Sequence, residues 1–596
     1  MKIERQDSGV QLPPHPESQP RPKPPKGKEK RTAFLRPDGL FLMKLGVFVF
    51  LGLFLILPLV SVFLVSFTGA PVNLLGSIVN PDILSTNLER FSNASLDHYK
   101  KLLAGGTYFK ALTNSLTLAL GVAVLVIVMC LPIAYGFART TMPFKKTFAA
   151  LCTMPIIVPT FISAAGFIIM FGRTGWVNSL YQGMGGNGVL FNVYSMLGIV
   201  LVQIFFFFPF ALWPMVAAFK LSDISLEEAS RNLGSSNWMS LVFVTFPLAI
   251  PGIISSALLI FTVSFSDFGT PIILAPEGLN LIVVEAYREI SGFFNWAGAS
   301  ILTVVMVLVA GFFFWIQRKI TKKMNYGTLS GKPKGIKLND NKWVANGLAI
   351  YTTIVISIPL FAVLSVLMQS FATTWGADLL PRGYTLDHYR TIFSRSTTNI
   401  VNSIVLALGA LGISVVVSTL VSYFVVRQNA AKLDFLSSVP LIVPGIALGI
   451  AYIQTFNTAP LQLTGTAAIL IIAYAIRRMP YMIRSTMGTM MSIKPDIEEA
   501  SINLGASRLL AIITVIGPLM LPGIAAGSIL VFVTVIKETS ITILMAPSNW
   551  APMSLVVFQN LLRGEVYTAS AMAILIIILV LFLQLAASKI SKNSLY

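Results

Sequence analysis

Two copies of one polar stretch organise this sequence: Glu227-Glu228-Ala229-Ser230-Arg231-Asn232-Leu233-Gly234 and Glu498-Glu499-Ala500-Ser501-Ile502-Asn503-Leu504-Gly505. The second copy lies 271 residues after the first, and the segments 227–253 and 498–524 are identical at 14 of 27 positions without a gap. Such a repeat in an apolar chain indicates a duplicated unit, in which each half carries the same polar device.

Each copy predicts a short helix, a turn and the start of a longer helix. Asp496 is a candidate N-cap in the second copy, and Gly234 and Gly505 stand where a helix commonly ends in a left-handed residue. Prolines follow at matching places, where they would kink or reset the next helix. These prolines are Pro247 and Pro251 in the first copy and Pro518 and Pro522 in the second.

Both copies resemble the EAA loop of binding-protein-dependent ABC importer permeases, whose pattern is Glu-Ala-Ala, three residues, Gly, nine residues and Ile-x-Leu-Pro. Serine replaces the third motif residue in both copies, and Gly517 replaces the usual leucine of the second. The resemblance implies that each loop is a coupling helix, inserted into a groove of one ATP-hydrolysing subunit. The residues that it assigns to these loops are Glu227, Glu228, Ala229, Gly234, Glu498, Glu499, Ala500 and Gly505.

The composition is that of a membrane protein. Of 596 residues, 55% are hydrophobic and 11% are charged, whereas soluble domains have about 25% charged residues. The two cysteines, Cys130 and Cys152, lie inside apolar runs and are interpreted as packing residues. With three histidines far apart in the sequence, no metal site is predicted.

Twelve apolar segments are long enough to span a bilayer, so we expect an all-α polytopic protein of two six-helix halves. The segments are 42–67, 111–138, 148–172, 192–218, 242–266, 297–317, 344–371, 399–426, 435–456, 465–484, 511–536 and 566–588. Other markers repeat along the chain, with an offset that shrinks from 290 to 271: Leu96-Asp97-His98-Tyr99 recurs as Leu386-Asp387-His388-Tyr389. The resemblance implies a fused pair of permease halves around a pseudo-twofold axis normal to the membrane.

The basic residues predict the orientation in the membrane. They concentrate in a polar N-terminal tail (residues 1–40) and in a linker (319–342). The first permease half (41–318) lies between the tail and the linker, and the second half (343–596) follows the linker. Because cytoplasmic segments are enriched in Lys and Arg, both termini and both motif loops are expected in the cytoplasm. The net charge of +19 is thereby explained as a topology signal, without a nucleic-acid partner.

Ionisable residues within apolar spans are candidates for a translocation path. They are Asp267, Arg477, Arg478, Lys537 and Glu538, and Glu538 aligns with Asp267 at the offset of 271. Two arginines facing a cavity would favour an anionic or chelated solute, whereas snorkelling or pairing with acidic residues would give them a structural role. Proline pairs at 155–159 and 440–444 either break a helix beside a cavity or are ordinary kinks.

The leading hypothesis is the permease subunit of an ATP-driven importer located in a bacterial inner membrane. The sequence has no Gly-x-x-x-x-Gly-Lys-Ser/Thr motif, so no cofactor is expected in this chain and ATP would be hydrolysed by two copies of a separate subunit. An extracytoplasmic binding protein would deliver the solute. The alternative is an ion-coupled secondary transporter, which would leave the paired loops unexplained.

The residues around Asp267 and Lys537-Glu538, together with the fused halves, resemble one branch of these permeases. That branch carries ferric iron, thiamine, putrescine or 2-aminoethylphosphonate. Ferric iron is the first expectation for this chain and 2-aminoethylphosphonate the second.

Overall fold

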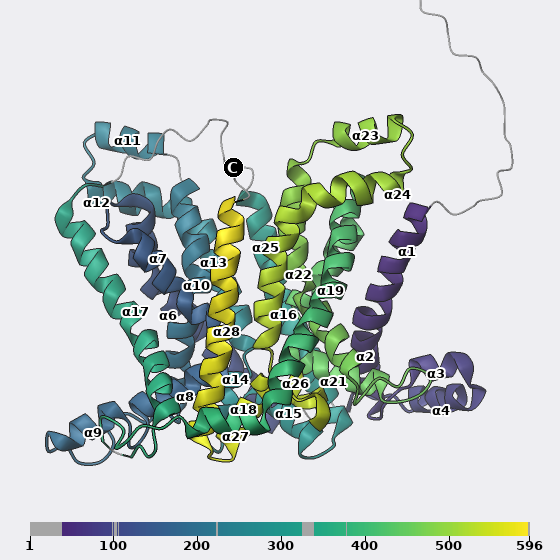
Figure 1. Cartoon of the computed structure of the whole chain (residues 1–596), viewed down its shortest axis with the longest axis horizontal. Coiled ribbons are helices and arrows are strands. Elements are labelled where there is room, and N and C mark those ends of the chain that lie inside the picture. Colours follow the sequence, from purple (N-terminus) through teal and green to yellow (C-terminus); the bar gives the residue numbers. More distant parts are fainter. Residues whose placement is uncertain are drawn as a thin grey trace, which may run out of the picture.

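The computed structural model describes residues 39–97, 99–100, 104, 106–221, 224–324, 339–376 and 378–593. This part of the chain is helical, and its only β-type contacts are two isolated bridges. Residues 1–38 of the expected tail and most of the expected linker lie outside the described residues. Long helices run side by side between two ends of the molecule (Figure 1).

The helices fall into two series that match in order. The first half contains α1 (Gly39–Leu51), α2 (Leu57–Thr68), α3 (Leu74–Val79), α4 (Pro81–Ser92), α6 (Thr107–Arg139), α7 (Lys145–Thr153), α8 (Thr160–Phe171), α9 (Trp176–Gly183), α10 (Met196–Leu221), α11 (Ile224–Asn232), α12 (Asn237–Ser240), α13 (Phe246–Phe265), α14 (Gly269–Leu274), α15 (Ile282–Ser291) and α16 (Trp296–Met324). The second half contains α17 (Lys342–Phe371), α18 (Asp387–Arg395), α19 (Thr397–Gln428), α20 (Ala431–Ser438), α21 (Gly445–Phe456), α22 (Ala467–Ser492), α23 (Pro495–Asn503), α24 (Arg508–Ala511), α25 (Gly517–Ile536), α26 (Thr542–Met545), α27 (Met553–Leu562) and α28 (Val566–Asn593).

The three-helix core of each half is repeated. Helices α6, α10 and α13 pack on one another in the first half, and α19, α22 and α25 do so in the second. The motif helices α11 and α23 lie at the same end of the molecule, here called the motif end (Figure 1). The start of α1 and the end of α28 are also at this end.

Ten helices among the described residues are long and apolar enough to cross a membrane, or eleven if a bent pair counts as one span. The remaining predicted span, 465–484, is part of α22, which is long and lies between α19 and α25. Three arginines make α22 more polar than the other long helices: Arg477, Arg478 and Arg484.

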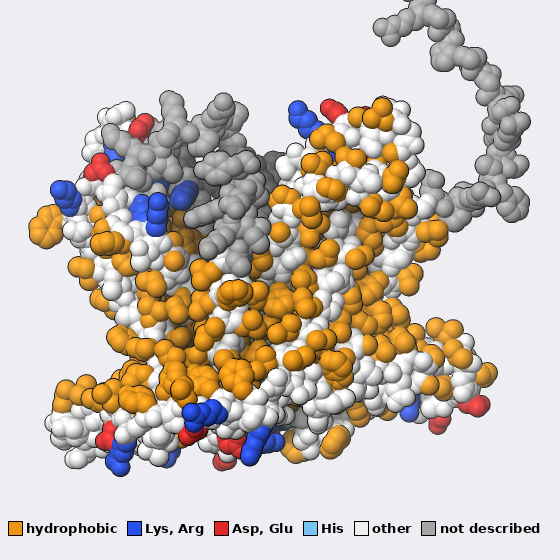
Figure 2. All heavy atoms as spheres, in the orientation of Figure 1, with side chains coloured by type: hydrophobic (Ala, Val, Ile, Leu, Met, Phe, Trp, Pro, Cys, Tyr) orange, Lys and Arg blue, Asp and Glu red, His pale blue; other side chains and the backbone are white. Residues whose placement is uncertain are grey.

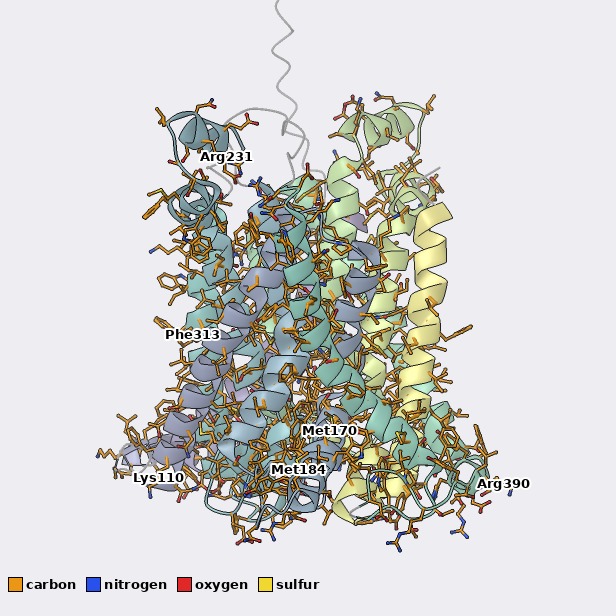
Figure 3. The ribbon with its side chains drawn as sticks, turned by 90° about the vertical axis from the view of Figure 1, so that its left-hand side faces the viewer. Lys110, Met170, Met184, Arg231, Phe313 and Arg390 are labelled. Carbon is orange, nitrogen blue, oxygen red and sulfur yellow. The ribbon has the colours of Figure 1, made fainter. Side chains whose placement is uncertain are left out.

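On the face shown in Figure 2, apolar side chains cover the middle of the molecule, and charged side chains gather toward its two ends. In a perpendicular view, Arg231 of α11 marks the motif end, and Lys110 and Arg390 mark the opposite end (Figure 3). Some basic residues at the opposite end are paired with acidic neighbours, as in Lys100–Asp97 and Arg390–Asp387. The chain is therefore a multi-pass membrane protein.

The proline pairs break their helices. In the second half the segments 431–441 and 445–456 meet at 105° around Pro444. In the first half a 3-10 turn, Met154–Ile157, precedes extended backbone at Val158, and α8 then begins at Thr160. Of the two interpretations left open by the sequence, a broken helix is the correct one.

The first long helix of each half packs against the other half. Tyr452 of α21 donates a 2.5 Å hydrogen bond to the carbonyl of Phe54, next to α2. In the reciprocal contact, α17 meets α8 so closely that a Cβ on Gly166 would lie 2.6 Å from the carbonyl oxygen of Ala362. These two reciprocal contacts join the halves into one unit.

Candidate functional site

Each motif helix ends as the sequence predicts. Gly234 and Gly505 have φ of +91° and +95°, a left-handed conformation that is costly for residues with a Cβ. The predicted N-cap of the second copy is wrong. Lys494 occupies the cap position, and Asp496 lies in the first turn of α23, where its charge favours the positive end of the helix dipole.

The first glutamate of each motif is turned inward. Glu498 of α23 accepts hydrogen bonds from Tyr423 (2.5 Å) and from Arg427 Nε (3.2 Å), and the Arg427 side chain is 13% exposed. In the first half, Glu227 Oε1 lies 3.2 Å from Arg139 Nη2 and accepts a bond from Thr245. These contacts fasten each motif helix to the end of α6 or α19.

The second glutamate of each motif faces solvent. Glu228 and Glu499 are exposed, as are the alanines that follow them, Ala229 and Ala500. Matching leucines project beside the terminal glycines: Leu233 is 88% exposed and Leu504 is 90% exposed. Each half thus presents an exposed acidic group and an exposed leucine at corresponding positions of the motif end.

A short π-helical turn links each motif to the next long helix. The turns are Leu241–Thr245 and Ile512–Ile516, and a proline follows each of them two residues later. Proline has no N–H and crowds the carbonyl of the preceding turn, so a wider turn relieves that conflict. The 271-residue repeat thus extends to backbone geometry.

The five predicted pathway residues line one cavity of about 210 Å³. The broken-helix segment 155–161 forms another part of its wall. The structure thereby brings together Asp267, Arg477, Arg478, Lys537 and Glu538, which come from three separate stretches of the sequence.

The wall from the second half is predominantly basic. Arg477 Nε lies 3.4 Å from Glu538 Oε2, and Arg478 Nη2 bonds to the same oxygen. The other Glu538 oxygen accepts a weak 3.4 Å bond from the Ile541 backbone N–H. Lys537 donates to a neutral acceptor, the carbonyl of Ile156. One carboxylate therefore faces three cationic groups.

The wall from the first half is aromatic and carries one acid. Asp267 Oδ2 accepts a 3.0 Å hydrogen bond from Gln203, whose amide oxygen accepts a 2.6 Å bond from Ser264. Phe206 and Phe207 occupy the positions that correspond to Arg477 and Arg478. The cavity is thus asymmetric although the fold is duplicated.

Small residues let the broken helix approach the segment that follows α13 or α25. A Cβ on Gly269 would lie 2.2 Å from Thr160 Oγ1, and one on Gly445 would lie 2.6 Å from the Cβ of Ser540. Gly445 aligns with Thr160 at an offset of 285, and Ser540 aligns with Gly269 at 271. The same close contact therefore occurs in both halves. In the first half the glycine follows α13, and in the second half it begins the second part of the broken helix.

Some residues of these sites were not predicted as such. Arg139 and Arg427 recur at an offset of 288, and each binds the inward glutamate of a motif. Their repetition beside a repeated acidic motif was the available clue. Gln203, by contrast, has no signal in the sequence. Among the described residues, no group of three His, Cys, Asp or Glu is placed to hold a metal ion.

The family model "binding-protein-dependent transport system inner membrane component" matches residues 131–326, which include α11, its π-turn and Asp267. The chain is also similar to the ferric transport system permease protein FbpB of Actinobacillus pleuropneumoniae (26% identity, covering 81% of this chain and 71% of the relative). These similarities support the identification of the chain as an ABC importer permease. It is therefore the permease component of an ABC transporter, a class distinct from the secondary transporters considered as the alternative.

Two further similarities bear on the solute. The putative ferric transport system permease protein FbpB 1 of Haemophilus influenzae is 28% identical, with 75% of this chain and 72% of the relative covered. The putative 2-aminoethylphosphonate transport system permease protein PhnV of Salmonella paratyphi A is 23% identical and matches 38% of this chain and 87% of the relative.

Proposed function

We propose that this permease forms the translocation path of an importer for ferric iron, energised by ATP hydrolysis in two separate subunits. An extracytoplasmic binding protein delivers the cargo at the end opposite to α11 and α23. Both termini and both motif helices then face the cytoplasm. The relatives named as ferric permeases support the choice of cargo, since they match most of the chain. The 2-aminoethylphosphonate relative supports the second candidate over a smaller part of the chain.

The observation that carries the proposed coupling is the paired surface at the motif end. Glu228 and Leu233 in one half are matched by Glu499 and Leu504 in the other, and all four side chains are exposed. A single exposed leucine is common on protein surfaces, but the same leucine and glutamate repeated at matching places in both halves fit a repeated contact with a partner. Two equal contact points at one end fit two copies of one ATPase subunit.

The internal ion pairs would transmit a movement of the motif helices to the membrane-spanning helices. Each motif helix is joined to the long helix α6 or α19 by its inward glutamate. After a turn and the short helix α12 or α24, a π-turn leads on into α13 or α25. Closure of two ATPases would therefore move the core helices of both halves together. Rocking of the halves would open the path alternately to each side.

The proposal is tested with the double variant Glu228→Lys/Glu499→Lys. We expect it to reach the membrane at the normal level, to lose ATPase binding and to lose ATP-dependent uptake of radioactive iron. The matched control is Asp387→Lys, an exposed acid at the opposite end. Normal uptake by the double variant would refute the coupling role. Uptake of aminoethylphosphonate in place of iron by the wild type would refute the proposal that the cargo is ferric iron.

A further inference from the structure

The basic wall of the cavity has more hydrogen-bond donors than the protein satisfies. Among the described residues, Arg477 and Arg478 share one oxygen of Glu538, and Lys537 donates to a backbone carbonyl. Nη1 of Arg477 and Nε of Arg478 are buried and have no hydrogen-bond partner among the described residues. Buried donors without partners are costly, so these groups call for an acceptor that the described part of the chain does not supply.

The distribution of charge around the cavity also favours an anionic ligand. Three basic side chains face two acids, and one of these acids, Asp267, is held by the neutral amide of Gln203 on the opposite wall. The excess positive charge therefore lies on the wall formed by α22 and the end of α25. Two adjacent guanidinium groups and one ammonium group are the donors that best match the oxygens of a carboxylate or phosphate.

We infer that this cavity is a binding site for an oxyanion of the carboxylate or phosphate class, held by Arg477, Arg478 and Lys537. The inference deepens the proposed function: ferric iron would pass as an oxyanion complex, with the anionic ligand on the basic wall. Asp267 lies on the other wall, where a carboxylate favours the cationic part of such a complex. A bare Fe³⁺ ion would instead meet three like charges.

Glu538 has a defined place in this scheme. Its carboxylate pairs with both guanidinium groups and would compete with an oxyanion for them. Loss of this competing charge should strengthen oxyanion binding. A purely structural role for the two arginines makes no such prediction, so Glu538→Gln separates the two roles.

The test measures equilibrium binding of radioactive citrate, phosphate and ferric citrate to the full-length protein in lipid nanodiscs. We expect Arg477→Gln and Arg478→Gln to weaken binding of the preferred ligand by about tenfold or more, as loss of a charged hydrogen bond implies. Glu538→Gln should bind more tightly than the wild type. The matched control is Arg484→Gln on the same helix, because Arg484 contacts Ser438 and Asp434 and does not line the cavity.

The ligands distinguish the source of the oxyanion. Binding of citrate or phosphate without iron identifies a site for the free anion, and binding of ferric citrate alone identifies a site for the metal-bound anion. Absence of binding by all three ligands, or equal binding by wild type and both arginine variants, would overturn the inference. Lys537→Met serves if an arginine variant does not fold. Since the assay contains no ATPase, its result is independent of the coupling test on Glu228 and Glu499.

Discussion

The Arg427 guanidinium lies 3.2 Å from the Glu498 carboxylate and anchors motif helix α23 to α19, 71 residues earlier in the chain. The same guanidinium donates a 2.9 Å bond to the carbonyl of Ile493, just before α23 begins. Both side chains are nearly buried, being 13% and 11% exposed. The pair is therefore a structural joint, whereas the neighbouring Glu499 is free to meet another protein.

Removal of the carboxylate in Glu498→Ala should destabilise the protein, because Arg427 would keep its charge in a nearly buried place without a counter-ion. We expect a loss of about 3 kcal/mol in the free energy of unfolding, measured by denaturant unfolding in micelles. Glu499→Ala is the control on the same helix and should unfold like the wild type. Equal stability of Glu498→Ala and wild type would show that the ion pair has no structural role.

Replacement of the exposed leucine in Leu504→Asp should separate the permease from its ATPase without unfolding it. The 90% exposed side chain contributes little to the fold, but burial in a partner groove would contribute about 1.5–3 kcal/mol, or roughly 10- to 100-fold in affinity. The measurement is co-purification of the ATPase at graded concentrations. Leu386→Asp is the control, since Leu386 is 56% exposed in the loop before α18 and far from α23. Unchanged ATPase affinity of Leu504→Asp would contradict the docking role.

The repeat allowed the architecture to be predicted, because apolar length and duplicated motifs are properties of the sequence itself. It could not reveal that Glu498 and Glu499 have different roles. Adjacent helical residues point in directions about 100° apart, and which direction is buried depends on Arg427 and Tyr423, far away in the chain. The sequence likewise marked Arg477 and Glu538 as unusual, but only the packing of α22 against α25 shows that they share an ion pair.

The contact between the halves predicts a strong effect of one methyl group. In Gly166→Ala the new Cβ would lie 2.6 Å from the Ala362 carbonyl oxygen, and this backbone atom cannot move aside cheaply. We expect α8 and α17 to separate and the melting temperature in detergent to fall. Gly121→Ala is the matched control, because Gly121 lies within α6 and no atom would approach its Cβ within 4 Å. Alanine is the better helix former, so the control should be as stable as the wild type or slightly more stable. Equal melting temperatures for the two variants would mean that the close approach of the halves is unimportant.

The glycine behind Arg477 predicts a local defect in the cavity. A Cβ in Gly445→Ala would lie 1.7 Å from Arg477 Nη1 and 2.6 Å from the Cβ of Ser540. The guanidinium can swing away, but the Ser540 Cβ is fixed by its backbone, so the broken helix must shift. We expect uptake and ferric citrate binding to fall at least about tenfold, because Arg477 loses its position beside Glu538. The amount of protein in the membrane should stay the same. Gly412→Ala in α19 is the control, since its Cβ would meet no atom within 4 Å. Normal uptake by Gly445→Ala would show that Arg477 need not keep this position for transport.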